Sequence, residues 1–364
     1  MPEKWKYARP YGYEVHDDPS DSKYYLRYFY VQEDCIKMLQ QMTKEELQQS
    51  ELVIHYWWYT DIRKIIDYNS EKHYIITKIL KEEELEQTIS CSSYYYIQGA
   101  FPSITSPGEY YHHSNGTLYY YPREGEDMNN IDVYSPIQEK DFRSIQFNDV
   151  PNLTIKNLKF YYTDHGIGGI NFNNLLIYNC EFRHVKTAFA VLGADNSVVD
   201  HCFIEDTSRS GCAFSGNYFT LQNCIIRNVG VVAPFGFAVD FWSGNNHTFI
   251  LNNDILDGTT SLIFFGANVE YNVEQEKNVL IENNHLHHGG YGIVDDLASM
   301  FFGRHPRGIV VNHNKIHDFY TNNYCGNGIY PDTGSSGTKV SNNFVYNLTL
   351  LLKIMEKNMK FITT

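Results

Sequence analysis

Three short phrases in the second half of the chain place an aspartate four residues after a glycine. They end at Asp240, at Asp296 (which Asp295 precedes) and at Asp332. Glycoside hydrolysis needs two carboxyl groups: one protonates the leaving oxygen, and the other acts as nucleophile or base. Crowding raises the pKa of one of them, as an acid catalyst requires. We therefore expect Asp296 and Asp332 to be neighbouring catalytic groups, with turn capping as the structural alternative.

A fourth phrase, from Gly266 to Glu270, fits the same spacing but has a competing alignment. In that alignment the Phe-Phe-Gly tripeptide at 264–266 matches the Phe-Phe-Gly tripeptide at 301–303. We adopt the second alignment because it matches three residues rather than two. It places Glu270 beyond the end of its strand.

Other side chains near these phrases could contact a substrate. Trp242 could stack on the apolar face of a sugar ring, with ordinary packing as the alternative. Arg304 and His305 belong to a basic island in an acidic protein and could bind a substrate carboxylate or hydroxyl, with a solvated loop as the alternative. The expected substrate-binding residues are Asp240, Trp242, Asp295, Arg304, His305 and Tyr330.

Four histidines, His287, His288, His313 and His317, lie near the polar pairs of a repeat described next. No carboxylate stands at a spacing that fixes a metal geometry. We interpret these histidines as ladder or surface residues, and we expect no metal site.

An internal repeat must position all these residues. From about residue 150 one phrase recurs eight times: an apolar residue, a polar pair that is often Asn-Asn or Asn-Cys, and another apolar residue. The second member of the pair falls at 158, 180, 202, 224, 253, 284, 314 and 343, so the steps are 22, 22, 22, 29, 31, 30 and 29. Steps of about 22 residues are typical of one coil of a parallel β-helix, in which stacked coils share a core.

The residue types at the pair suit the corner of such a coil. Asn tolerates the left-handed backbone conformation, and its amide can bond to the Asn one coil away. Cys180, Cys202 and Cys224 share one repeat position and predict a ladder of buried thiols, although a coil spacing of about 4.8 Å also allows a disulfide. The extra residues of the later coils predict loops on one face, which places the functional side within residues 225–340.

We therefore predict an all-β fold, a right-handed single-stranded parallel β-helix (solenoid) over residues 151–347. Residues 1–150 form a mixed, β-rich capping region. It has helical sequence from Glu33 to about Ser50 with a capping box at Thr43, and strands over 51–59 and 116–122. Residues 348–364 leave the repeat and read as a helical tail, either a cap or a shortened end.

Composition excludes several classes of partner. The net charge is −14, from 29 basic and 43 acidic residues, and argues against nucleic acid or an anionic membrane surface as a partner. No apolar run is long enough for a membrane span. The first residues lack the apolar segment of a secretory signal, so the compartment is left open.

Four segments resemble right-handed β-helix proteins related to glycoside hydrolase family 141, of the pectin-lyase-like superfamily. They are residues 106–122 (SPGEYY followed by GTLYYYP), 51–57 (ELVIHYW), 296–318 (from DLASMFFG to NKIHD) and 328–336 (GIYPDTGSS). The last match is the most specific. The resemblance implies a hydrolase acting on plant or microbial polysaccharide, with its two catalytic acids at Asp296 and Asp332. The chain departs from the family pattern at Ala298 and Phe301. Family members are secreted, which the resemblance implies here as well.

Two alternatives remain. A pectate-lyase-like polysaccharide lyase would need Ca²⁺ bound by carboxylates and a base for proton abstraction. A non-catalytic β-helix, or a shortened inactive relative, would bind a glycan without turnover. For the hydrolase we expect no cofactor, a polysaccharide or oligosaccharide as partner, and a monomer.

Overall fold

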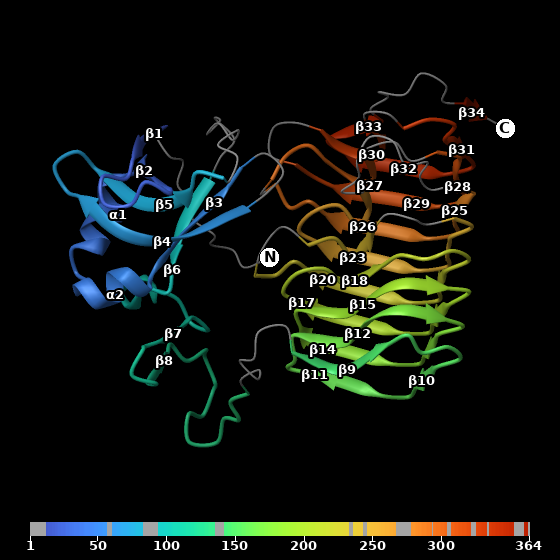
Figure 1. The fold of residues 1–364 in the computed structure, drawn as a ribbon, viewed down its shortest axis with the longest axis horizontal. Coiled ribbons are helices and arrows are strands. Elements are labelled where there is room, and N and C mark those ends of the chain that lie inside the picture. The colour runs from blue at the N-terminus through green and yellow to red at the C-terminus, as the bar shows by residue number, and fades with distance from the viewer. Residues whose placement is uncertain are drawn as a thin grey trace. The chain divides into compact units, whose positions relative to one another are not determined.

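The computed structural model describes residues 12–56, 60–82, 94–134, 142–232, 236–242, 246–266, 278–292, 294–303, 307–321, 325–332, 335–352 and 360–362. The chain divides into two compact units, Met1–Val133 and Tyr134–Thr364 (Figure 1).

The first unit is built on a six-stranded antiparallel sheet with the order β1-β2-β5-β4-β3-β6. Two short helices pack against β4. A core that includes Phe29, Leu39 and Ile54 fills the space between helices and sheet, and Arg27 pairs with Asp61 inside the unit at 3.0 Å. The elements of this sheet and its helices are β1 (Gly12–Asp17), β2 (Tyr24–Tyr30), α1 (Glu33–Leu39), α2 (Lys44–Gln49), β3 (Glu51–His55), β4 (Thr60–Asn69), β5 (Tyr74–Leu80) and β6 (Tyr94–Gln98).

The elements predicted for this unit are present. Helix α2 begins after Thr43 with the expected capping box: Thr43 Oγ1 accepts from the Glu46 N–H at 3.2 Å, and Glu46 Oε2 accepts from the Thr43 N–H at 2.8 Å. Strand β3 confirms the start of the predicted strand at 51, whereas residues 57–59 lie outside the described part. A 3₁₀ turn, η1 (Phe101–Ser103), precedes a hairpin of β7 (Tyr110–His112) and β8 (Leu118–Tyr120), which confirms the strand expected after Asn115.

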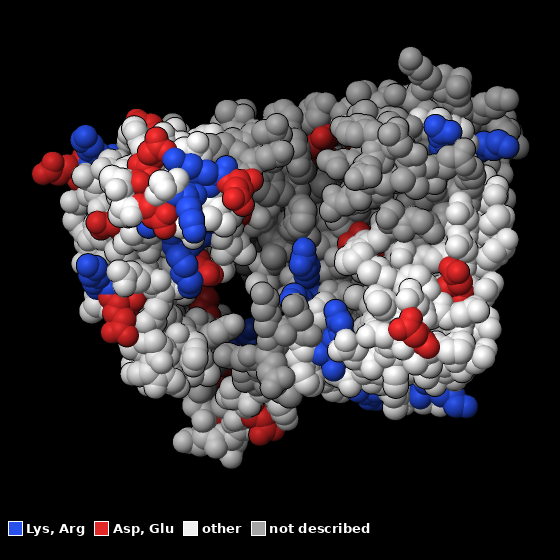
Figure 2. Space-filling view, in the orientation of Figure 1, with Lys and Arg blue, Asp and Glu red and all other residues white. Residues whose placement is uncertain are grey.

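The surface of the first unit carries charges of both signs. Figure 2 shows acidic and basic side chains interspersed over its strands. Several of them pair, as Lys78 does with Asp18 at 2.7 Å and Lys64 with Glu51 at 3.1 Å. Neither α1 nor α2, nor any other helix in the described residues, has the length and hydrophobicity that a membrane-spanning helix needs.

The second unit is a parallel β-helix in which the coils contribute strands to three parallel sheets (Figure 1). The first sheet contains β10 (Thr154–Lys156), β13 (Leu176–Tyr178), β16 (Val198–Asp200), β19 (Thr220–Gln222), β22 (Phe249–Leu251), β25 (Val279–Glu282), β28 (Ile309–Asn312), β31 (Lys339–Ser341) and β34 (Lys360–Ile362). The second contains β11 (Lys159–Tyr161), β14 (Glu181–Val185), β17 (Phe203–Thr207), β20 (Ile225–Val229), β23 (Asp254–Gly258), β26 (His285–Gly289), β29 (Lys315–Phe319) and β32 (Phe344–Leu348). The third contains β9 (Arg143–Asn148), β12 (His165–Asn173), β15 (Thr187–Asp195), β18 (Cys212–Phe214), β21 (Val239–Phe241), β24 (Ile263–Gly266), β27 (Leu297–Gly303), β30 (Gly326–Pro331) and β33 (Leu350–Leu352).

Apolar side chains of all three sheets meet in one core that runs the length of the solenoid. Alternate residues of a strand point to opposite faces of its sheet, so each short strand buries one or two side chains. In the third sheet the rings of Phe214 and Phe241 lie 4.4 Å apart, and those of Phe241 and Phe265 stack at 3.8 Å. Like residues in successive coils therefore lie in contact in this part of the core.

The corner between the first and second sheets confirms the predicted ladders. The first residue of every polar pair has a positive φ, from Asn157 to Asn342. In the later coils the second residue is a buried Asn. Asn253 Nδ2 donates to Asn284 Oδ1 at 2.9 Å, and Asn284 Nδ2 donates to Asn314 Oδ1 at 3.0 Å. The earlier coils place the thiols of Cys180, Cys202 and Cys224 in the same column; they are buried and form no disulfide.

The ends of the solenoid differ from the prediction. Strand β9 begins at Arg143 and pairs with β12, so the third sheet starts before residue 151. The predicted helical tail is wrong: β33 pairs with β30, and β34 pairs with β31. The edge of the last coil offers unpaired N–H and C=O groups, and strand pairing satisfies them where a helix would not.

Candidate functional site

The lengths of the connections single out the outer face of the third sheet. Between the first and second sheets the connection is two residues in every coil, from 157–158 to 342–343. In the longer coils the extra residues lie instead in the connections before and after the strands of the third sheet. These long connections cover residues 230–238, 242–248, 267–278, 290–296, 304–308, 320–325 and 332–338. The expectation that the added length falls on one side of the solenoid is met, and that side is the third sheet.

Four side chains form a row across this outer face. The register aligns Asp240 with Phe264, Phe264 with Phe301, and Phe301 with Tyr330. Their neighbours along the strands, such as Phe241 and Phe265, belong to the core. Because side chains alternate along a strand, the four members of the row point away from the core.

The aromatic members of the row contact one another. Phe237 and Phe264 stack with ring centroids 3.8 Å apart, Phe264 and Phe301 stack at 5.4 Å, and Phe301 meets Tyr330 edge-on at 4.9 Å. Tyr330 is buried, with 2% of its surface exposed. The result is a continuous aromatic strip across β24, β27 and β30.

Two glycines give these rings their room. Gly266 and Gly303 are paired in register, which confirms the predicted Phe-Phe-Gly alignment. The described part of this coil ends with β24 at Gly266, so Glu270 lies outside the described residues. A Cβ on Gly266 would lie 1.9 Å from the ring of Phe264, and one on Gly303 would lie 2.7 Å from the ring of Phe301. The rings therefore lean over positions that only a glycine leaves open.

Asp240 is the titratable end of the row. The indole N–H of Trp242 donates to Asp240 Oδ2 at 3.2 Å. Burial raises the pKa of Asp240 to about 6, against the opposing effects of this hydrogen bond and of the charge of Arg209. Trp242 itself is 45% exposed. A carboxyl group that is half protonated near pH 6, beside an exposed indole, is suited to proton transfer at a bound ligand.

The expected pairing of Asp296 with Asp332 is wrong. Phe302 is aligned with Pro331, so Asp332 lies beside Gly303 on the neighbouring strand. Gly303 comes seven residues after Asp296, so Asp332 is displaced from Asp296 by seven residues along the strand direction. At about 3.3 Å per residue this is roughly 23 Å, well beyond the 5–9.5 Å that separates the two carboxyl groups of a glycosidase. The two glycine phrases are therefore not in register with each other.

The two aspartates lie at opposite ends of the strands of the third sheet. Asp295, which is buried, and Asp296, with a φ of 56°, precede β27. Asp332 follows β30, and its N–H donates to the carbonyl of Phe302 at 2.8 Å. The structure thus brings Asp240, Trp242 and Tyr330 onto one outer face, with Asp332 at its far strand. The predicted residues Arg304 and His305 lie outside the described residues.

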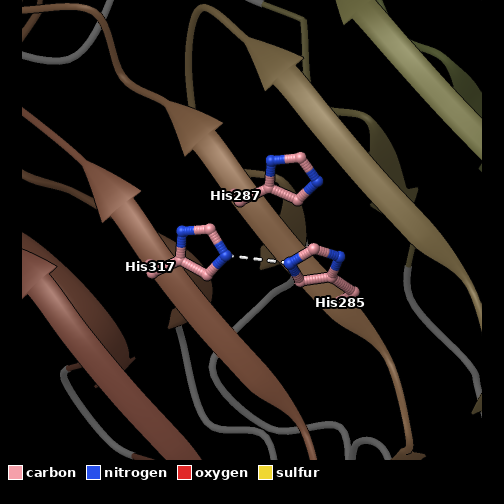
Figure 3. Close-up of side chains that lie close together, drawn as sticks. All are labelled: His285, His287 and His317. Atoms are coloured by element: carbon pink, nitrogen blue, oxygen red, sulfur yellow. Dashed lines mark hydrogen bonds between the residues drawn. The ribbon is translucent and has the colours of Figure 1, made fainter.

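A second group of polar side chains was not predicted as a site. His285, His287 and His317 come together on the second sheet (Figure 3). His287 and His288 lie within β26 and His317 lies within β29, not at the Asn corners where we expected them; His313 does lie at a corner. The alternation His285-x-His287, combined with the repeat step that leads from His287 to His317, is the signal that could have revealed the cluster.

The fold and the face just described define a class. A family model described as a right handed beta helix region matches residues 143–345. The match covers more than half of the chain, and the protein therefore belongs to this family of right-handed β-helix proteins.

One solved structure agrees on the fold over nearly the whole chain. A structure titled "Glycoside hydrolase" is similar with a TM-score of 0.73 at 15% sequence identity, covering 98% of this chain and 73% of that one. The A-module of mannuronan C-5 epimerase AlgE6 from Azotobacter vinelandii gives a TM-score of 0.39 at 12% identity, covering 61% of this chain and 75% of the module. A comparison with curated protein sequences finds no match.

Proposed function

We propose that the protein is a carbohydrate-active enzyme that hydrolyses a glycosidic bond in a plant or microbial polysaccharide. The substrate lies along the outer face of the third sheet. The observation that carries the proposal is the contact between Asp240 and Trp242, at the end of the strip in which the rings of Phe264 and Phe301 are half-buried. Flat apolar sugar faces pack on aromatic rings, while carboxyl groups bind or protonate their oxygens.

Asp240 is the proton donor in this proposal. A general acid must be protonated at the working pH and must give up its proton readily, which a pKa near that pH provides. The pKa of Asp240, raised to about 6 by burial, meets this condition in mildly acidic solution. Trp242 has two roles: its ring face is a platform for a sugar, and its N–H holds the carboxyl group in position.

Asp332 has a different role from the one first expected. In register, Trp242 is followed on the next three strands by Gly266, Gly303 and Asp332. Trp242 and Asp332 are therefore three strand spacings, or about 14 Å, apart, and Asp240, two residues before Trp242, is no nearer to Asp332. This separation is too large for an acid–base pair acting on one bond. We propose instead that Asp332 binds hydroxyl groups of a sugar at the far end of the same face.

The likeness of residues 328–336 to proteins related to glycoside hydrolase family 141 supports a hydrolase, and that membership is part of the proposal. One observation favours the alternative of a glycan-binding β-helix without turnover: Asp296 and Asp332 lie at opposite ends of the strands of the third sheet, too far apart to act as a pair. Both functions use the same aromatic strip, so only a measurement of turnover separates them.

The test is hydrolysis of a panel of neutral and acidic polysaccharides and aryl glycosides, read as new reducing ends together with ultraviolet absorbance. We expect reducing ends without absorbance, and Asp240→Asn should lower kcat/KM by roughly 10²–10⁴-fold, the usual contribution of a general acid. Asp206→Asn is the matched control, because the next coil carries Asn228 at that position.

Three results would contradict the proposal. Absorbance from an unsaturated product would identify a lyase. Full activity of Asp240→Asn would remove Asp240 from the mechanism. If the wild-type protein cleaved nothing on the panel but bound a glycan, and Trp242→Ala lost that binding, the protein would be a glycan-binding β-helix.

A further inference from the structure

The histidine cluster lies on the outer face of the second sheet. His285 and His287 alternate along β26 with the core residue Leu286 between them, and His317 is aligned with His287 on β29. One ring nitrogen from each of the three lies within 4.8 Å of the other two. Three imidazoles from two neighbouring coils therefore lie together, and Figure 3 shows His285 and His317 in contact with His287 beside them.

The closest approach joins two nitrogens of the same kind. His285 Nε2 and His317 Nε2 are 2.8 Å apart. A neutral imidazole has one N–H and one lone pair, so such a contact needs either one shared proton or a cation that accepts both lone pairs. The other nitrogen of each ring shows which nitrogen carries the lone pair.

In both rings that other nitrogen faces a carboxylate. His317 Nδ1 lies 2.7 Å from Asp318 Oδ2, and His285 Nδ1 lies 3.1 Å from Asp254 Oδ1. A carboxylate holds the proton on Nδ1 and so directs the lone pair onto Nε2, which is the outer-shell arrangement of metal-binding histidines. With both protons on Nδ1, the two Nε2 lone pairs face each other and hold either one shared proton or a metal ion. The third imidazole, that of His287, makes the group a candidate set of metal ligands.

The surroundings suit an ion with nitrogen ligands. The side chains of His317 and His287 are only 9% and 12% exposed, whereas His285 is 36% exposed and leaves access from solvent. Two carboxylates, Asp254 and Asp318, offset the positive charge of an ion, and the nearby Lys315 is exposed and can turn to solvent.

We propose that His285, His287 and His317 bind one divalent transition-metal ion, with Zn²⁺ as the expected metal. Imidazole ligands suit Zn²⁺, Cu²⁺ and Ni²⁺, whereas Ca²⁺ and Mg²⁺ require oxygen ligands. Zn²⁺ binds imidazole nitrogen at about 2.0–2.1 Å, so its ligand nitrogens lie a little over about 3 Å apart. In the cluster two of the nitrogens are 2.8 Å apart and all three lie within 4.8 Å of one another. The ion links β26 to β29 and thereby cross-links two coils of the solenoid.

The competing explanation is a stacking ladder. The rings of His287 and His317 stack at 5.2 Å, and His317 stacks on Tyr346 of the following coil at 4.6 Å. Stacking needs only flat rings, whereas metal binding needs their nitrogens. Phenylalanine at 317 preserves the ring and removes the ligand, so His317→Phe separates the two explanations.

The experiment uses the full chain without a histidine tag, stripped with EDTA and then titrated with Zn²⁺ by calorimetry and with Co²⁺ by visible spectroscopy. We expect one Zn²⁺ per chain, a tetrahedral Co²⁺ spectrum and a higher Tm in the presence of the ion. His317→Phe and His285→Phe should each weaken binding at least about 100-fold. Asp318→Asn, which acts through His317, should weaken it roughly 10–100-fold.

The control is His313→Asn, because other coils carry Asn at that corner. It should bind Zn²⁺ as the wild type does. The proposal is overturned if the wild type shows no saturable binding, or if His317→Phe binds Zn²⁺ with unchanged affinity. A fold check by circular dichroism on metal-free variants ensures that lost binding is not lost structure.

Discussion

The indole N–H of Trp242 donates a hydrogen bond to Asp240 Oδ2 across two positions of one strand end, at 3.2 Å. The same bond orients the carboxyl group and lowers its pKa, while burial raises the pKa more strongly, to about 6. Four predictions concern this contact, the Asn ladder and the glycine beneath the aromatic strip.

The first prediction concerns the pH dependence of activity. If Asp240 is the proton donor, kcat/KM falls as pH rises through about 6, because the acid loses its proton. Trp242→Phe keeps an aromatic ring but removes the donor that favours the carboxylate, so it moves this limb to higher pH. The measurement is the pH profile of kcat/KM for both proteins. An unchanged limb in Trp242→Phe would show that the bond does not hold the carboxyl pKa down.

The second prediction concerns stability. In the unfolded chain an Asp has a pKa of about 3.9, and in the folded protein Asp240 has a pKa of about 6. Between these values the folded state binds more protons, so the free energy of unfolding decreases as pH rises from about 4 to 6 and then levels off.

Asp240→Asn removes this loss. Above pH 6 it should be more stable than the wild type by roughly 1–2 kcal/mol, less than the full shift implies because the group is partly exposed. Urea denaturation at pH 4.5 and 7.5 measures the difference, with Asp206→Asn as the control. A variant that is less stable than the wild type at pH 7.5 would contradict the assigned pKa direction.

The repeat allowed much of this architecture to be predicted from sequence. Asn at the corner adopts a positive φ and binds the next Asn, so the spacing of the pairs fixes the register of the first and second sheets. The corner has two residues in every coil, and this constant length made the eight polar pairs recognisable in the sequence. Similarly, Phe264 and Phe301 could be aligned because each ring needs a glycine two residues later.

The candidate site was harder to predict because it lies where the repeat is interrupted. The connections before and after the strands of the third sheet differ in length from coil to coil. The phrase that ends at Asp296 is therefore not aligned with the phrase that ends at Asp332. The histidine cluster was missed for another reason. The repeat step from His287 to His317 could have brought these residues together on neighbouring strands, but the orientation of the rings toward Asp254 and Asp318 does not follow from spacing.

The third prediction tests the Asn ladder. Asn284 donates to the carbonyl of Ile250 and to Asn314, and accepts from both the N–H and the amide of Asn253. Asn284→Ala leaves buried partners without hydrogen bonds, which costs about 2–3 kcal/mol in the free energy of unfolding. Chemical denaturation measures it against Gln146→Ala, an exposed position of β9 where a change of under about 0.5 kcal/mol is expected. Equal effects would mean that the ladder adds nothing to stability.

The fourth prediction concerns the glycine beneath the aromatic strip. A methyl group at Gly266 would lie 1.9 Å from the ring of Phe264, so that ring must rotate away. The ring is on the outer face, and its movement opens no cavity in the core. Gly266→Ala should therefore lower stability by only about 1 kcal/mol. It should still break the stack of Phe264 with Phe237 and Phe301 and weaken glycan binding at least about tenfold.

The control for the strip is Gln146→Ala, at an exposed position of the edge strand β9 of the same sheet. It shortens a side chain far from the strip, so glycan binding should stay as in the wild type. Affinity electrophoresis in gels that contain the polysaccharide reports binding for active and inactive proteins alike. If Gly266→Ala binds as tightly as the wild type while its Tm is nearly unchanged, the aromatic strip is packing rather than a binding surface, and the substrate must lie elsewhere.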